Sequence, residues 1–252
     1  MSIRLLTYNV RYATLDGDPN AWPERRDGVA SLVRFHRPDV VCLQEVWETQ
    51  LADLEARLPG YEWVSERTSS GEHTPVGYRA DRLSVLDREV FSLSETPEDL
   101  HAMDWETTVP RVTTAARFRD AETGAAVVVA STHLDHDSER ARREGAALLA
   151  DRFGDRPPAV VAGDFNCTPD DRPYRTMTEA GFRDARAVAD APHGPETTFN
   201  DFEHPQEGKR IDHVFVSDDV DVGRFAVLAD LDDRGLYPSD HFAVLADLEL
   251  PP

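Results

Sequence analysis

Residues Pro157 to Phe165 read PPAVVAGDF, an apolar run that ends in an aspartate and a phenylalanine. A helical pattern that extends through Leu148 precedes this run, and the segment from Ala125 to Leu134, AAVVVASTHL, is a second apolar run before that helix. Short apolar runs are typical of strands buried on both faces, and helices that join such strands cover the faces of the resulting sheet. This stretch therefore predicts a layered α/β fold.

The N-terminal half has the same organisation. Residues Arg4 to Val10 alternate as in a strand, a helix is predicted from Pro23 to about Phe35, and Asp39 to Leu43 (DVVCL) form another buried strand. A further helical pattern runs from Thr49 to Leu58. Helix-linked buried strands in both halves, with hairpins between them, predict an α/β sandwich in which two packed mixed β-sheets are flanked by helices.

Strand patterns outnumber helical ones along the chain. Five of them follow one another between residues 61 and 134, and we expect these to form a meander. A short helix is expected around Pro173–Ala180, and three late strands complete the pattern. The strand segments not yet named are Tyr61–Glu66, Thr74–Arg79, Leu83–Leu93, Arg111–Asp120, Arg210–Ser217, Val220–Leu228 and His241–Leu250.

The chain has 252 residues and contains no internal repeat, low-complexity segment or linker-like block, so we expect one domain over residues 1–252. No apolar run approaches the roughly 18–20 residues that a membrane span needs. The N-terminus, MSIRLLTYNV, lacks the features of a signal peptide and is predicted to be a strand. The expected location is therefore cytoplasmic.

The formal net charge is −21, and Lys209 is the only lysine. This balance fits either a surface adapted to high salt or a GC-rich genome that encodes Arg in preference to Lys. In both cases no broad basic face is expected, so the chain has no obvious surface for duplex DNA. The two cysteines, Cys42 and Cys167, lack zinc-site spacing and are expected to be buried thiols. No protein partner can be inferred.

Polar residues fall at or near the ends of six apolar segments. Each of them alone also fits a turn residue, a cap or a buried polar side chain with a hydrogen-bond partner. Asp212 is the hardest to explain in that way, because a carboxylate between Ile211 and Val214 costs several kcal/mol to bury without a partner. In layered α/β folds such side chains gather in one crevice at the strand ends. The set comprises Asn9, Glu45, His133, Asp164, Asn166, Asp212, Asp240 and His241.

The composition of this set restricts the chemistry. Oxygen ligands in small number suit Mg²⁺ or Mn²⁺, and imidazoles beside such an ion suit phosphate binding and proton transfer. A cysteine cluster for structural zinc, a G-x-S-x-G elbow and a Walker A loop are all missing from the sequence.

The segments TYNVR, LQEV, THLDH, GDFN, RIDHVFVS and YPSDHF occur in this order between Thr7 and Phe242. Together they resemble the endonuclease/exonuclease/phosphatase superfamily, which includes deoxyribonuclease I-like enzymes. The resemblance spans nearly the whole chain and implies a four-layer α/β sandwich with Mg²⁺-dependent phosphoester hydrolysis.

The resemblance also implies roles for individual residues. Glu45 matches the metal-ligand glutamate, Asn9 the asparagine that supports metal and phosphate, and Asp240 the neighbouring acid of the metal site. The remaining matches are Asp164 and Asn166 for orienting water and phosphate, His133 for a phosphate oxygen or the leaving group, and Asp212 with His241 for the Asp–His dyad.

The chain departs from the apurinic-site endonucleases of this superfamily, because Arg11 stands where they carry an aspartate. This argues against a repair role and against a second metal at that place. The chain is most similar to a prokaryotic branch with W-x-x-R and SETP segments. Arg111, which that branch shares, is expected to bind substrate phosphate or to form a structural salt bridge. Four more residues are candidates for the pocket or for ordinary packing: Trp22, Trp105, His136 and Asp137.

The leading hypothesis is a Mg²⁺- or Mn²⁺-dependent phosphoesterase. Its substrate would be a small phosphorylated molecule, a phosphodiester or a short single-stranded nucleic acid. Two alternatives stay open. One is a nuclease on longer DNA or RNA, and the other is a phosphate- or nucleotide-binding protein without catalysis on the same scaffold.

Overall fold

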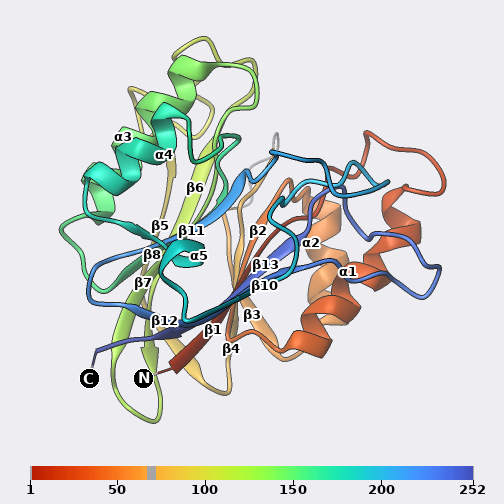
Figure 1. The fold of residues 1–252 in the computed structure, drawn as a ribbon, viewed down its shortest axis with the longest axis horizontal. Helices are drawn as coiled ribbons and strands as arrows, with labels where there is room; N and C mark the ends of the chain where they lie inside the picture. Colours follow the sequence, from red (N-terminus) through yellow and green to blue (C-terminus); the bar gives the residue numbers. More distant parts are fainter. Residues whose placement is uncertain (1, 67–71, 252) are drawn as a thin grey trace.

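The computed structural model describes residues 2–66 and 72–251, in which two β-sheets pack face to face between pairs of helices (Figure 1). In spatial order, the first sheet contains β10 (Ala191–His193), β12 (Asp221–Leu228), β13 (Ala243–Glu249), β1 (Ser2–Asn9), β2 (Val40–Gln44), β4 (Val76–Arg79) and β3 (Tyr61–Val64). The second contains β5 (Leu83–Ser92), β6 (Val112–Asp120), β7 (Ala126–His133), β8 (Ala159–Asp164), β11 (Asp212–Val216) and β9 (Arg183–Asp184).

Two helices cover the outer face of each sheet. On the seven-stranded sheet lie α1 (Trp22–His36) and α2 (Glu48–Arg57), and on the six-stranded sheet lie α3 (Glu139–Phe153) and α4 (Arg172–Glu179), as Figure 1 shows. A short helix, α5 (Ala185–Val188), follows β9. None of the described helices has the length and apolar character that crossing a membrane requires.

Three apolar cores separate these layers. The alternation of side chains along β1 shows how, because Leu5 points into the core between the sheets and Leu6 into the core under α1 and α2. The third core joins the six-stranded sheet to α3 and α4, for example through Phe215 and Leu149. The predicted four-layer α/β sandwich with two mixed sheets is thereby confirmed.

The predicted meander is wrong in one respect. β3 and β4 belong to the seven-stranded sheet, whereas β5, β6 and β7 belong to the six-stranded one. The chain therefore changes sheets between Arg79 and Leu83. The pattern of a strand does not show which strand it pairs with. Here β4 pairs with β2 and so covers an edge of β2 whose backbone groups would otherwise be unpaired. The short elements β9, α5 and β10 have no counterpart in the predicted pattern.

Arg25 in α1 connects two loops, the one between β1 and α1 and the one between β12 and β13. Its guanidinium is fully buried and donates hydrogen bonds to the carbonyl oxygens of Val10, Arg11, Asn20 and Pro238. Burial lowers its pKa to about 10, which still leaves it charged at neutral pH. Val10 and Arg11 follow β1 directly, and Pro238 precedes β13, so Arg25 holds the exit of one strand against the entry of the other.

Candidate active site

Strand register brings three of the predicted side chains into one row. His133 on β7 is paired with Asp164 on β8, and Asp164 is paired in turn with Asp212 on β11. Side chains at paired positions project to the same face of a sheet. An imidazole and two carboxylates, all buried, therefore lie side by side at the ends of three interior strands of the six-stranded sheet.

Asn9 connects this row to the other sheet. It is the last residue of β1, and its Nδ2 donates to Asp164 Oδ2 and to Glu45 Oε1, each at 3.0 Å. Its Oδ1 accepts from the backbone N–H of Arg11 at 3.0 Å. Asn9 is fully buried, so these bonds fix the two acids relative to each other across the sheet interface.

The backbone around the site takes conformations that most residues avoid. Arg11, Glu45 and Asn166 have left-handed φ angles of 57°, 58° and 47°. Each costs about 1–3 kcal/mol and is retained where the surroundings fix it, often at functional sites. Gly163, just before Asp164, cannot be replaced easily, because a Cβ there would lie 1.9 Å from the carbonyl oxygen of Thr132.

Asp212 and His241 form the predicted pair. His241 Nδ1 lies 2.9 Å from Asp212 Oδ2, and its Nε2 lies 3.7 Å from Asp164 Oδ2. Burial alone would lower the pKa of His241, but the carboxylates of Asp212 and Asp164 outweigh it and raise that pKa well above the ordinary 6.5. The ring of Phe199 meets the His241 ring edge-on at 5.1 Å. The two acids thus favour the imidazolium form of His241, and the bond to Asp212 holds the ring in one orientation.

His133 has an acidic partner that the sequence analysis missed. Its Nδ1 contacts Glu72 Oε1, and its Nε2 lies 3.0 Å from Asn166 Nδ2 and 3.4 Å from Asp164 Oδ2. Nε2 can accept from the amide when the ring is neutral or donate to Asp164 when it is protonated. Burial opposes a charge on His133, yet Glu72 raises its pKa overall.

Arg111 occupies the same corner and is 5% exposed. It donates to Glu72 Oε2 at 2.8 Å and to Asp135 Oδ2 at 3.3 Å, and its Nη2 lies 2.7 Å from His136 Nδ1. Arg111 forms the buried salt bridges of one predicted alternative and also lines the cavity, so its binding of substrate phosphate stays a prediction. Glu72 stands in the polar segment SGEHT rather than at a strand end, which is why no pattern in the sequence marked it.

Glu45 and Asp240 lie on the opposite side of the site. Asp240 Oδ2 is 3.2 Å from Arg11 Nη1, and Glu45 Oε2 accepts from the N–H of Tyr12 at 2.9 Å. Burial raises the pKa of Asp240, and the nearby charge of Glu45 adds to this, although His241 and Arg11 oppose it. A buried carboxylate whose charge is opposed by a neighbouring carboxylate is a favourable environment for a cation.

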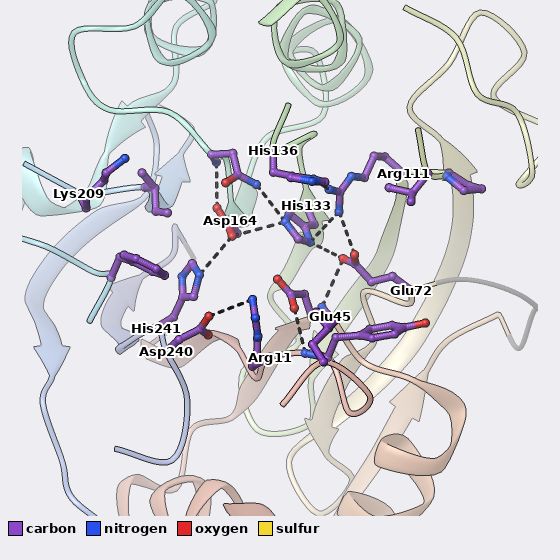
Figure 2. A pocket seen from close by; sticks show the side chains of 17 residues that line it. Arg11, Glu45, Glu72, Arg111, His133, His136, Asp164, Lys209, Asp240 and His241 are labelled. Carbon is purple, nitrogen blue, oxygen red and sulfur yellow. Dashed lines mark hydrogen bonds and ion pairs between the residues drawn. The ribbon is translucent and has the colours of Figure 1, made fainter. Parts of the chain in front are cut away.

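These groups surround a cavity of about 590 Å³, seen from close by in Figure 2. In that view His133 and His241 lie on either side of Asp164, with Arg111 and Glu72 beyond His133 and Asp240 with Arg11 below His241. Lys209, the single lysine of the chain, lies at one end. The lining comprises Arg11, Tyr12, Leu15, Glu45, Glu72, Val109, Pro110, Arg111, His133, His136, Asp164, Asn166, Phe199, Lys209, Ile211, Asp240 and His241.

The remaining sequence candidates divide into three groups. Asn9 and Asp212 lie behind the wall and contact residues that form it. His136 lines the cavity, whereas Asp137, with which it forms a 3.2 Å ion pair, does not. Trp22 and Trp105 are not lining residues either. Trp22 packs in the core beneath α1 and donates to Asp53, and Trp105 donates to Glu95.

Two sets of ligand atoms suit a divalent metal. Asp164, Asp212 and His241 each offer one atom within 4.8 Å of the others, and Asp212 Oδ1 is buried without a hydrogen-bond partner among the described residues. Glu45 and Asp240, supported by Asn9, offer carboxylate oxygens at the other side. Both sets are rich in oxygen, as Mg²⁺ and Mn²⁺ prefer, so the residues present fit such an ion.

A family model described as the Endonuclease/Exonuclease/phosphatase family matches residues 6–241, which include all the site residues above. The chain belongs to the endonuclease/exonuclease/phosphatase family. Members of this family are hydrolases that act on phosphoester bonds.

Solved structures of family members are similar over the full length. The endonuclease/exonuclease/phosphatase from Bacteroides vulgatus is 35% identical, with 100% of both chains covered and a TM-score of 0.94. A mannosyl-6-phosphatase from Bacteroides thetaiotaomicron is 30% identical, with 98% of this chain and 100% of that chain covered and a TM-score of 0.90.

Among curated proteins, Nocturnin from Drosophila melanogaster is 24% identical over 316 residues, which is 99% of this chain and 47% of the relative. Protein angel from the same species is 26% identical over 69% of this chain and 51% of its own length. The chain thus spans about half the length of these two relatives.

Proposed function

We propose that this protein is a divalent-metal-dependent phosphoester hydrolase that acts on a small phosphorylated molecule. The observation that carries the proposal is the convergence of two imidazoles on one carboxylate inside the cavity. His133 Nε2 and His241 Nε2 lie 3.4 Å and 3.7 Å from Asp164 Oδ2. Two N–H donors and one acceptor at a single point suit a phosphate oxygen next to an attacking water.

We place the metal on Glu45 and Asp240, with Asn9 holding Glu45 in position. The set of Asp164, Asp212 and His241 is the weaker choice, because a histidine must be neutral to bind a metal and the pKa of His241 is raised by its two acids. An Mg²⁺ or Mn²⁺ ion bound to Glu45 and Asp240 would neutralise charge on the phosphate oxygens. Arg11, paired with Asp240, supplies a fixed positive charge beside it.

The other residues of the site would act on the attacking water and on the phosphate oxygens. Asp164 has its Oδ1 held by the N–H of Asn166 at 2.9 Å and would accept a proton from the attacking water through Oδ2. His241, charged and oriented by Asp212, would donate through Nε2 to a phosphate oxygen. His133 would donate to the leaving-group oxygen or to a second phosphate oxygen.

The cavity supports a small substrate. Its volume of about 590 Å³ lies within the range of about 300–1,000 Å³ that is usual for small-molecule sites. Sugar phosphates are the first substrate class that we propose, since the relative named a mannosyl-6-phosphatase is 30% identical over nearly the whole chain. Nucleotides and short single strands come second, because Phe199 and Tyr12 offer aromatic surface in the cavity wall.

Two other functions are less well supported. A nuclease on long nucleic acid would need a basic path for the backbone, and a net charge of −21 argues against one. A binding protein without catalysis would not need Asp212 and His241 held at 2.9 Å beneath the cavity.

A substrate panel tests the proposal. Purified protein with Mg²⁺ or Mn²⁺ should hydrolyse at least one of mannose 6-phosphate, p-nitrophenyl phosphate, bis-p-nitrophenyl phosphate, mononucleotides and a short oligonucleotide. Asp164→Asn and His241→Ala should each lower kcat by about 100-fold or more. Glu45→Gln should weaken Mg²⁺ binding in calorimetry and abolish turnover. Turnover of no ester above the Glu45→Gln control would contradict the proposal, and Mg²⁺ binding without turnover would favour the non-catalytic alternative.

A further inference from the structure

Lys209 differs from the other cationic groups of the cavity wall in its surroundings. Arg11 and Arg111 each form salt bridges with two carboxylates. The three imidazoles of the wall also have an acid within 4.0 Å. Among the residues that the structure describes, Lys209 has no such partner, and its side chain is exposed. In a chain with a net charge of −21, this ammonium is the cation of the cavity that is most available to an anionic ligand.

The backbone of Lys209 is fixed relative to the site. Its carbonyl oxygen accepts from the N–H of Thr198 at 3.0 Å. Thr198 is fully buried, its Oγ1 accepts from the N–H of Asp212 at 3.0 Å, and its carbonyl oxygen accepts from the N–H of Phe242 at 2.7 Å. Phe242 directly follows His241, so Thr198 connects the backbone of Lys209 to both members of the Asp212–His241 pair. The ammonium therefore starts from a defined place beside the site and not from a free loop.

The cavity wall near Lys209 in the sequence is apolar. Ile211 lines the cavity with Lys209, whereas Arg210 between them does not and forms a salt bridge elsewhere. Phe199 lines the cavity as well, and its ring meets the ring of His241 edge-on at 5.1 Å. A sugar or base ring can pack against Phe199 and Ile211 while its charged substituents contact His241 and Lys209.

This arrangement provides a place for an anion in addition to the reacting phosphate. In the proposed function the reacting phosphate lies at Asp164, and Figure 2 shows Lys209 to one side of Asp164 and Arg111 to the other. The charge of Arg111 already has two acidic partners. A lysine is a compact charge with three donors on a flexible stem, which suits a phosphate group at the end of a substrate. A substrate with a single phosphate at Asp164 would leave this ammonium without an anionic partner.

We propose that Lys209, with Phe199 and Ile211, forms a subsite for a second phosphate group, and that the substrate is a sugar or nucleoside ring that carries two phosphates. Hydrolysis at Asp164 would break the bond between one phosphorus and the ring oxygen. The oxygen of water would bond to that phosphorus, and a proton would pass to the ring oxygen. The products are inorganic phosphate and a ring that keeps the phosphate bound by Lys209. This inference rests on the proposed phosphoester hydrolysis.

Matched substrate pairs test the inference. One pair is glucose 1,6-bisphosphate with glucose 6-phosphate, and the other is adenosine 3′,5′-bisphosphate with adenosine 5′-monophosphate. In at least one pair the wild type with Mg²⁺ should have a KM about 10-fold lower for the bisphosphate, since a charge-assisted hydrogen bond contributes roughly 10- to 100-fold in affinity. The pair that shows the preference identifies the ring.

Replacement of the lysine should remove that preference. Lys209→Ala should raise the KM for the bisphosphate by about 10-fold and change the KM for the monophosphate by less than about twofold, because only the second phosphate contacts Lys209. Equal wild-type KM values within both pairs would overturn the inference. So would an equal rise for bisphosphate and monophosphate in Lys209→Ala, because Lys209 would then act on the reacting phosphate or on the fold.

Two further variants separate a local contact from an effect of net charge. Lys209→Arg keeps a cation at the subsite and should retain most of the preference for the bisphosphate. Arg34→Ala removes one positive charge from the exposed side of α1 and should leave both KM values unchanged. Loss of the preference in Arg34→Ala to the level of Lys209→Ala would show an effect of net charge and overturn the inference.

Calorimetry on Asp164→Asn protein with Mg²⁺ tests the subsite without turnover. The bisphosphate of the same pairs should bind about 10-fold more tightly than the monophosphate, and adding Lys209→Ala should remove the difference. This result together with a wild type that hydrolyses no ester would contradict the proposed function and still support the subsite. Hydrolysis of bisphosphates and monophosphates alike, with no effect of Lys209→Ala, would support the proposed function and overturn the subsite.

Discussion

At the scale of single residues, the site depends on charges that are buried together. Asp164, Asp212 and His241 are each at most 5% exposed, and a lone buried charge of this kind costs several kcal/mol. The structure offsets that cost by pairing, since His241 lies between two carboxylates. His241 therefore links the protonation of the site to the stability of the fold.

We predict a pH-dependent contribution of His241 to stability. Its pKa is raised in the folded protein above the ordinary 6.5 of an unfolded chain. Such a group stabilises the fold fully below about pH 6.5, and the contribution is lost as pH rises through the folded-state pKa. With metal removed by a chelator, the difference in free energy of unfolding between wild type and His241→Gln should be largest at low pH and shrink as pH increases.

Urea unfolding across a pH series measures this difference. In an Asp212→Asn background the pH dependence should be much weaker, because Asp212 is the main source of the raised pKa of His241. A difference that grew with increasing pH would contradict the assignment of His241 as a buried imidazolium.

At the scale of elements, the periodicity of the sequence predicted the main helices and strands but not which strands pair with each other. The predicted strand at Arg4–Val10 is β1 at Ser2–Asn9, which is buried on both faces. The helix predicted at Pro23 to Phe35 is α1 at Trp22–His36, which has one apolar stripe. The division of β3 to β7 between two sheets depends on contacts far apart in the chain. Glu72 was missed for the same reason, since only tertiary packing brings it to His133.

Arg25 allows a prediction about how elements are held together. Replacement by methionine removes the donors that satisfy the carbonyl groups of Val10, Arg11 and Pro238. We expect Arg25→Met to lower the free energy of unfolding by about 3 kcal/mol, since leaving one buried acceptor unsatisfied costs about 1–3 kcal/mol. Arg25→Lys should lose less, because an ammonium keeps the charge and up to three donors.

Chemical denaturation of the Arg25 variants measures this, with Arg34→Met as the matched control. Arg34 lies on the same helix, and its guanidinium makes an exposed hydrogen bond to the carbonyl of Arg57. Its replacement should change stability by about 0.5 kcal/mol or less. Equal effects of the two replacements would show that the buried bonds of Arg25 contribute nothing.

At the scale of the whole molecule, the charge is unevenly distributed. The chain has a net charge of −21, yet Arg11, Arg111 and Lys209 all line the one cavity that holds the candidate site. The carboxylates of Glu45, Glu72, Asp164 and Asp240 line the same cavity, so its formal charges nearly balance, and a small anion meets less repulsion there than a long polyanion meets on the acidic surface. The acidic surface was predicted from the net charge of the sequence, but the sequence could not show which of its 27 Lys and Arg residues line the cavity.

We predict that salt stabilises the protein. Between about 0.1 M and 1 M KCl the Debye length falls from about 10 Å to about 3 Å, which screens repulsion among the surface carboxylates. The midpoint of thermal unfolding should rise by about 2–4 °C for each kcal/mol of repulsion relieved. Scanning calorimetry over a KCl series measures the change, and a falling midpoint would mean that attractive ion pairs outweigh the net repulsion.

The pairing of β1 with β13 also has a consequence for biosynthesis. β1 leaves the ribosome first, but β13, one of its two neighbours in the sheet, is synthesised last. The hydroxyl that donates to the carbonyl of Asn9 belongs to Ser239, 230 positions later. A nascent chain therefore carries Asn9, Glu45 and Asp164 without the imidazole of His241 or the strand that anchors it. We therefore expect chains that end before β13 to be inactive in the proposed hydrolysis, because the site is complete only after the last strand has joined the sheet.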